Sequence, residues 1–145
     1  MQIVKVKIKK LSSLPLPKYE TPLASGLDLR ANVESNGFIL ARQRKTIPTG
    51  ISIELPEGYE AQVRPRSGLA MRSGVKACLG TIDADFRGEI CMTIFNDSDR
   101  VFHYAPGDRL AQLVIAPVVH AELVESDELS ETERGSNGWQ STGIK

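Results

Sequence analysis

Residues 90–95 read ICMTIF, and this stretch determines the fold class because its side chains alternate in character with a period of two. One face carries three large apolar side chains and the other carries mixed ones (Ile90, Met92 and Ile94 against Cys91, Thr93 and Phe95). Successive side chains of a strand point to opposite faces of a sheet, so the alternation predicts a half-buried β-strand.

Similar stretches occur along the chain, separated by turn-forming residues. A period of two marks residues 4–8 and 51–55, and residues 110–116 form a nearly continuous apolar run. Prolines and glycines lie between these stretches. Short strands at such spacing favour an antiparallel sandwich or barrel, so the sequence predicts an all-β fold.

One segment departs from this pattern and predicts a short helix. Residues 67–74 read SGLAMRSG, with Ser67 as a suitable N-cap, helix formers in the middle and Gly74 as a suitable C-terminal stop. We expect about two helical turns and no second helix.

Length and charge restrict the class of protein. The chain has 145 residues, which predicts one domain, and its 18 Lys+Arg balance its 18 Asp+Glu. A neutral chain lacks the basic face of most nucleic-acid-binding domains, and no apolar run approaches the ~20 residues that span a bilayer. The N-terminus also lacks the apolar core of a signal peptide. We therefore expect a cytoplasmic protein that binds neither nucleic acid nor membrane.

The cysteines and histidines do not predict a metal centre. The chain has no C-x-x-C pair, and neither of its two histidines has a second ligand at metal spacing. Buried, reduced thiols are the favoured interpretation of Cys78 and Cys91.

Residues suited to an anion lie at the start of the predicted helix. Arg66 offers a fork-shaped donor that fits phosphate oxygens, and Gly68 allows an anion to approach the backbone closely. The alternative is a simple capped helix that begins at Ser67 beside a surface arginine.

Acidic and amide groups occur in three further segments. Asp83, within the charged stretch at 80–89, has the chemistry to activate a water, although a hairpin with solvated charges is the alternative. Asp28 lies between apolar neighbours and, if buried, needs either an arginine or a hydrated cation as its partner. Gln112 stands near the start of the apolar run, where a buried amide must be hydrogen-bonded.

The C-terminal part cannot build a core. Residues 122–133 contain six carboxylates and no basic residue, and residues 134–143 read RGSNGWQSTG. A disordered end is one interpretation. An arm that orders over a ligand is the other, because Trp139 is large and gains by burial and Arg134 can bind an anion.

Together and in this order, the segments resemble the five motifs of the trimeric deoxyuridine triphosphatase (dUTPase) family over nearly the whole chain. The matching segments are ASGLDLRA at 24–31, PRSGLA at 65–70, GTIDADFRGE at 80–89, GDRLAQL at 107–113 and RGSNGWQSTG at 134–143. The second and third are highly specific in combination.

The resemblance implies a fold and an activity. The fold is a distorted jelly-roll or β-barrel with one short helix, formed by residues 1–133, and a flexible C-terminal arm, residues 134–145, that closes over the active site. The activity is hydrolysis of dUTP to dUMP and pyrophosphate with Mg²⁺, which supplies dUMP for dTMP synthesis and keeps uracil out of DNA. The family also implies a homotrimer whose sites are shared between subunits.

Roles for individual residues follow from the same resemblance. Asp83 activates the attacking water, Gln112 helps to orient it, Arg134 clamps the terminal phosphate, and Arg109 supports the acidic network. Asp28 acts on Mg²⁺ through water, while the triphosphate holds most of the ion. Substrate binding is implied for the second motif, the base-binding and sugar-packing parts of the third, and the arm (Arg66, Ser67, Gly68, Gly80, Thr81, Ile82, Asp83, Phe86, Cys91, Arg134, Trp139, Gln140, Ser141 and Thr142).

Two other functions stay open at this stage. A dCTP deaminase shares the fold and would need a catalytic glutamate near the base, for which Glu89 is the candidate. A non-enzymatic trimeric β-protein could retain the scaffold to bind a partner. The chain also departs from the common motifs, with Phe86 in place of a tyrosine and Gln140 in place of a glycine of the arm.

Overall fold

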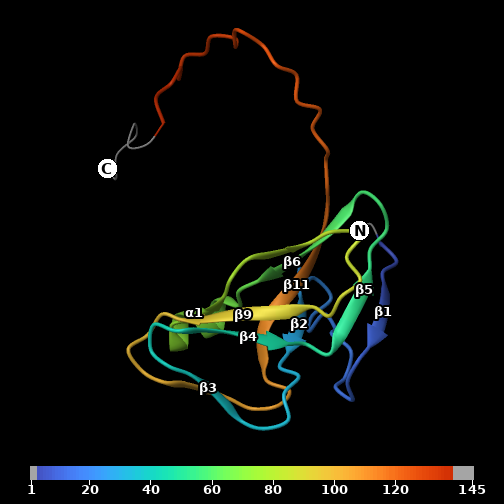
Figure 1. Cartoon of the computed structure of the whole chain (residues 1–145), viewed down its shortest axis with the longest axis vertical. Coiled ribbons are helices and arrows are strands. Elements are labelled where there is room, and N and C mark those ends of the chain that lie inside the picture. Colours follow the sequence, from blue (N-terminus) through green and yellow to red (C-terminus); the bar gives the residue numbers. More distant parts are fainter. Residues whose placement is uncertain (1–2, 139–145) are drawn as a thin grey trace.

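The computed structural model describes residues 3–138, which form short strands and one helix around an apolar core (Figure 1). The elements are β1 (Lys7–Lys10), β2 (Leu27–Arg30), β3 (Gly37–Ile39), β4 (Arg44–Pro48), β5 (Ile51–Glu54), β6 (Tyr59–Arg64), α1 (Ser67–Ser73), β7 (Val75–Ala77), β8 (Gly80–Ile82), β9 (Cys91–Asn96), β10 (Phe102–Tyr104) and β11 (Arg109–Pro117). The predicted all-β class with one short helix is confirmed.

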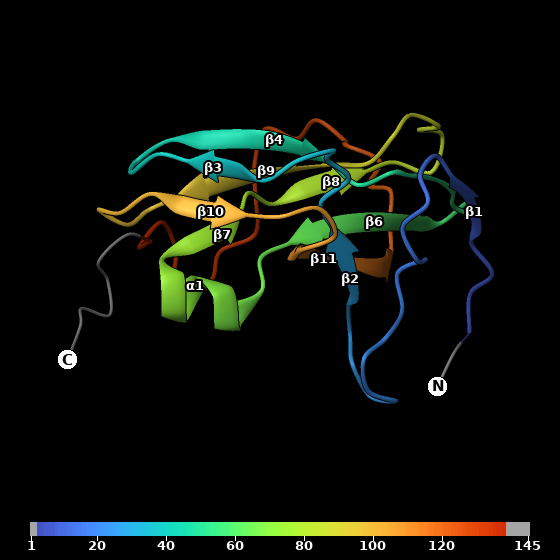
Figure 2. The ribbon, with the colours of Figure 1, turned by 90° about the horizontal axis from the view of Figure 1, so that it is seen from below.

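The strands pair antiparallel in four open sheets. The largest has the order β2-β11-β6-β8, a second has the order β4-β9-β7, and β1-β5 and β10-β3 form two-stranded pairs. Seen from below, β3 and β4 lie on one side of the molecule and β2, β11 and α1 on the other (Figure 2). The arrangement resembles a jelly-roll, and within residues 3–138 no single sheet closes into a barrel.

The core contains the apolar face that the alternation of residues 90–95 predicts. Ile90, Met92 and Ile94 are at most 1% exposed, whereas Cys91 on the opposite face is exposed. Full burial of such a side chain stabilises a fold by about 1.5–3 kcal/mol. The same period-two rule therefore accounts for both faces of β9.

The helix has the predicted length but begins differently. Its N-cap is Arg66, which has extended backbone angles and makes no side-chain cap hydrogen bond, so Ser67 is the first helical residue and not the cap. The Arg66 carbonyl accepts the first helical bonds, from the amides of Leu69 and Ala70. The helix ends as predicted at Gly74, whose φ of 64° is left-handed and whose N–H donates to the Ala70 carbonyl.

The prediction that both cysteines are buried is wrong, because Cys78 and Cys91 are exposed free thiols. Strand alternation explains this: each cysteine directly follows a buried residue, Ala77 or Ile90, and therefore points outward.

The chain beyond β11 leaves the body of the molecule. Residues 118–138 form no strand and arc away into solvent, as Figure 1 shows. The division into a domain ending at residue 133 and an arm from 134 stays a prediction. In the part of the chain that the structure describes, no helix has the length and apolar character needed to cross a membrane.

Candidate functional site

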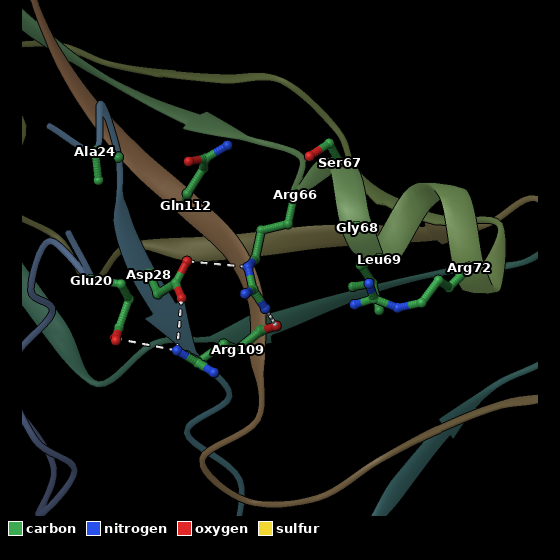
Figure 3. A pocket seen from close by; sticks show the side chains of 11 residues that line it. Glu20, Ala24, Asp28, Arg66, Ser67, Gly68, Leu69, Arg72, Arg109 and Gln112 are labelled. Carbon is green, nitrogen blue, oxygen red and sulfur yellow. Dashed lines mark hydrogen bonds and ion pairs between the residues drawn. The ribbon is translucent and has the colours of Figure 1, made fainter.

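A hollow of about 360 Å³ lies where β2 and β11 meet the beginning of α1 (Figure 3). Its volume lies within the usual range for small-molecule sites. It is lined by residues from the N-terminal loop, β2, α1 and β11 (Glu20, Ala24, Gly26, Asp28, Arg66, Ser67, Gly68, Leu69, Arg72, Arg109 and Gln112).

Strand register brings the predicted residues of three motifs to this place. Gln112 on β11 stands opposite Asp28 on β2 and, on its other side, opposite Arg64 at the end of β6. Arg66, Ser67 and Gly68 follow β6 directly, so they reach the same end of the sheet. The first, second and fourth motifs therefore meet around one hollow.

Charged side chains in the hollow form a chain of ion pairs. Asp28 Oδ1 lies 3.1 Å from Arg66 Nε, and Oδ2 lies 3.2 Å from Arg109 Nη1, which is also 3.2 Å from Glu20 Oε1. Arg66 Nη1 also donates to the Arg109 carbonyl at 2.7 Å. The side chain of Asp28 is only 13% exposed, and its two arginines satisfy the need of a buried carboxylate for partners.

Gln112 is held in one orientation from two sides. Its Nε2 donates to the Pro65 carbonyl at 2.9 Å. On the opposite side Gly26 lies so close that a Cβ on this residue would overlap the Gln112 side-chain amide. The missing side chain at position 26 therefore makes room for Gln112.

The third motif lies at the far edge of the same sheet. Gly80, Thr81 and Ile82 form β8, and Asp83 follows it as an exposed residue. Asp83 is three strands away from Asp28 and about four residues further along the sheet, which corresponds to about 20 Å at usual strand spacing and rise. One chain therefore does not bring Asp83 to the hollow.

Phe86 packs against its own turn. The Phe86 amide donates to the Asp83 carbonyl at 3.1 Å, and a Cβ on Gly88 would lie 2.5 Å from the edge of the Phe86 ring. The ring is nevertheless 44% exposed. It is therefore an apolar surface that a ligand can contact.

Cys91 lies at the start of β9, opposite Pro48 on β4 and outside the hollow. The pKa of this thiol is raised above its usual value. The main cause is partial burial, and the negative charge of nearby Glu89 is a second, smaller cause. Glu89 itself accepts a hydrogen bond from the Gly50 amide, a backbone contact within the fold.

The predicted residues of the arm do not reach the hollow within the described part of the chain. Arg134 does not line the hollow, and its Nε donates to the Asn137 carbonyl within its own turn in the segment after β11. Trp139, Gln140, Ser141 and Thr142 lie outside the described residues.

Two charged lining residues, Glu20 and Arg72, were not predicted as site residues. Arg72 could have been predicted from the sequence, because it lies four residues after Gly68 in the predicted helix and the two residues therefore share one helix face. Glu20 stands in a loop whose sequence gives no local indication of a contact with Arg109.

These features define an all-β protein with a small ligand site in which three arginines outnumber two carboxylates. Such a hollow favours an anionic ligand.

The comparisons with known proteins give the family. The family model described as dUTPase matches residues 12–143. A deoxyuridine 5'-triphosphate nucleotidohydrolase of Beijerinckia indica subsp. indica is 49% identical, with 96% of this chain and 91% of the relative covered. One of Chlamydia pneumoniae is 52% identical over 88% of this chain and 90% of the relative. The chain belongs to the dUTPase family, and the predicted resemblance is confirmed.

Solved structures agree with the fold. The dUTPase of Staphylococcus bacteriophage 80alpha with dUPNHPP has a TM-score of 0.87 at 25% identity, with 97% of this chain and 99% of that chain covered. A point mutant of the dUTPase from phage phi11 of S. aureus has a TM-score of 0.78 at 22% identity, with 88% of this chain and 99% of that chain covered.

Proposed function

We propose that this protein hydrolyses dUTP to dUMP and pyrophosphate, supplies dUMP for dTMP synthesis and keeps uracil out of DNA. The observation that carries the proposal is the meeting of Asp28, Arg66 and Gln112 around one cationic hollow, since these residues come from three of the five family motifs. The activity named for relatives about 50% identical to this chain supports it.

The second motif binds the phosphate chain. Ser67 and Gly68 are the first residues of α1, where backbone N–H groups have no partner within the helix. The hydroxyl of Ser67 and the guanidinium of Arg66 add donors beside them. Gly68 exposes its amide without a side chain, which lets phosphate oxygens come close.

The chemical step is an in-line displacement by water. Asp83 accepts a proton from the water, the water oxygen forms a bond to the α-phosphorus, and the bond to the leaving pyrophosphate breaks. Gln112 is held by Pro65 in a fixed orientation from which its amide positions this water. Positioning and charge stabilisation supply most of the catalysis in phosphoryl transfer.

The rest of the substrate contacts the third and fifth motifs. Backbone groups of Gly80, Thr81 and Ile82 bind the uracil, Phe86 packs against the deoxyribose, and Cys91 lies beside the base. Residues 134–145 close over the site, with Arg134 on the terminal phosphate, Trp139 over the uracil, and Gln140, Ser141 and Thr142 near the phosphates.

Mg²⁺ is the proposed cofactor. The described residues hold no cluster of three His, Cys, Asp or Glu side chains, and both oxygens of Asp28 contact arginines. Such a donor set fits an ion that takes its ligands from the triphosphate and from water, with Asp28 as an outer contact. When bound, the ion spreads the charge of the phosphate chain. The structurally similar phage phi11 dUTPase coordinates a structural Mg(II) ion.

A homotrimer with shared sites is proposed because a single chain leaves the motifs apart. Asp83 is about 20 Å from Asp28 along the sheet, so a second copy has to bring its third motif to the hollow. The extended segment after β11 also leaves large apolar side chains at least 80% exposed, which packing against another copy would cover (Val119, Leu123, Val124 and Leu129). We place the trimer in the cytoplasm, without a nucleic-acid or membrane partner.

The test is release of pyrophosphate with dUTP, dTTP, dCTP and UTP as substrates. We expect turnover of dUTP to exceed that of the others clearly. Ammonia release from dCTP would instead identify a deaminase, and absence of any turnover would support a non-enzymatic β-protein.

A further inference from the structure

A third arginine faces the hollow, and none of the motif assignments gives it a role. We infer that Arg72 is a further phosphate-binding residue, which contacts non-bridging oxygens of the phosphate chain together with Ser67 and Gly68. The inference rests on the proposed function for the identity of the ligand, whereas the residue itself is selected by geometry and charge.

The position of Arg72 follows from the helix. It lies four residues after Gly68, so both residues share one face of α1. A Cβ on Gly68 would lie 3.1 Å from each terminal nitrogen of the Arg72 guanidinium, so the guanidinium lies beside this glycine. Figure 3 shows the side chain directed back along α1 toward Arg66 and the hollow.

The charges of the hollow are distributed unevenly. Arg66 and Arg109 both pair with Asp28, and Arg109 also pairs with Glu20, so both carboxylates of the lining are already used. The side chain of Arg72 makes no hydrogen bond or ion pair with any residue in the range 3–138. The positive charge that is left over in the hollow therefore belongs to Arg72.

Arg66 and Arg72 therefore differ in how many N–H donors they can offer to a ligand. Arg66 uses its Nε on Asp28 and its Nη1 on the Arg109 carbonyl, so only part of its donor set is available to a ligand. All five N–H donors of Arg72 are available, and a guanidinium matches phosphate oxygens in pairs. An anion between Arg66 and Arg72 also relieves the repulsion of two like charges that face the same hollow.

One alternative is that Arg72 serves only the helix. A cation in the last turn interacts favourably with the negative C-terminal end of a helix. The guanidinium of Arg72, however, is directed toward the N-terminal half of α1, over Gly68. A second alternative is an ion pair with a carboxylate of another copy, which the experiment has to separate from phosphate binding.

The experiment is isothermal titration calorimetry on the full chain with three ligands: dUpNHpp, dUMP and inorganic tripolyphosphate. The variants are Arg72→Gln and, as a matched loss of one positive charge outside the hollow, Arg100→Gln. For Arg72→Gln we expect Kd for dUpNHpp and tripolyphosphate to rise by about 10- to 100-fold, the range for a hydrogen bond to a charged group. We expect dUMP to be affected far less, and Arg100→Gln to change none of the three Kd values appreciably.

Equal Kd values for the wild type and Arg72→Gln with both phosphate-chain ligands would overturn the inference. A changed oligomeric mass with unchanged Kd values would show that Arg72 pairs with another copy, which also overturns it. Wild-type turnover of dUTP is measured in parallel. If Arg72 governs tripolyphosphate binding but dUTP is not hydrolysed, the proposed function fails and the assignment of Arg72 stands.

Discussion

Asp28 and Gln112 show how single residues shape the hollow. Asp28 holds Arg66 on one oxygen and Arg109 on the other, so one largely buried carboxylate fixes the direction of two guanidinium groups. A hydrogen bond to the Pro65 carbonyl fixes Gln112 on one side. On the other side its amide fits against Gly26, where a side chain would overlap it. Fixed orientation is what a phosphoryl-transfer site requires.

At this scale we predict that Gly26→Ala reduces turnover through Gln112. The added methyl group would displace the Gln112 amide and break its bond to the Pro65 carbonyl. Misplacement of a positioning group by about 1 Å costs on the order of 10²-fold in rate, so kcat should fall by about one to two orders of magnitude. The measurement is kcat and KM for dUTP, with KM expected to change less than kcat.

The control for Gly26→Ala is a double-mutant cycle with Gln112→Ala. If the alanine acts through Gln112, then adding Gly26→Ala to Gln112→Ala costs little further activity. Strictly additive losses would mean that Gly26 acts on some other group.

At the scale of elements, α1 is a short helix that depends on its ends. It contains no fully buried residue and has seven residues, too few for a helix that is stable by itself. Its last turn is closed by the Gly74 amide, and the Gly74 carbonyl accepts from the Asp97 amide at 2.8 Å, which attaches the helix end to the neighbouring turn. This helix carries the proposed phosphate-binding residues Ser67 and Gly68, so its C-terminal end supports the proposed site.

We predict that Gly74→Ala destabilises the fold more than Gly58→Ala. Both glycines have left-handed φ angles, 64° and 81°, which cost an alanine about 1–2 kcal/mol. A Cβ at position 74 would in addition press on the Ser98 Cβ at 3.1 Å, whereas position 58 is open. Urea unfolding at one fixed protein concentration measures the difference in the free energy of unfolding. Equal costs would show that Ser98 moves away freely.

At the scale of the whole molecule, the proposed site needs more than one chain. The order β2-β11-β6-β8 places the hollow at one edge of the sheet and the third motif at the other. The register of β11 with β6 and of β6 with β8 fixes which residues face each other across the sheet. A local movement of a loop therefore cannot bring Asp83 to the edge of the sheet where Asp28 lies.

We predict that two inactive variants complement each other. Asp83→Asn and Gln112→Ala should each lose most turnover, since a general base contributes about 10²- to 10⁴-fold. In a mixture refolded at equal amounts, about one quarter of shared sites combine an intact Asp83 with an intact Gln112 from different chains, and activity should return to about that fraction. Light scattering on the same samples should give the mass of three chains.

The control is each variant refolded alone under the same conditions. No regain of activity in the mixture, with normal mixed oligomers, would mean that each site is built within one chain and would remove the shared-site model.

The local elements can be inferred from the amino-acid sequence alone. Alternation in residues 90–95 predicts the strand and its buried face, the segment 67–74 predicts a two-turn helix with its stop at Gly74, and the ordered motifs predict the family. These features depend on periods of two and of 3.6 and on backbone preferences of single residues, which a linear chain displays directly.

Which residues come into contact, in contrast, depends on the three-dimensional fold. The sequence left the partner of Asp28 open between an arginine and a hydrated cation, and the register of β2 and β11 with the path after β6 supplied Arg66 and Arg109. The contact of Glu20 with Arg109 and the separation of Asp83 from Asp28 likewise follow from strand order and loop path. Such contacts join residues far apart in the chain, so no local period or propensity encodes them. They are fixed only when the sheets pair in register and pack their apolar faces into one core.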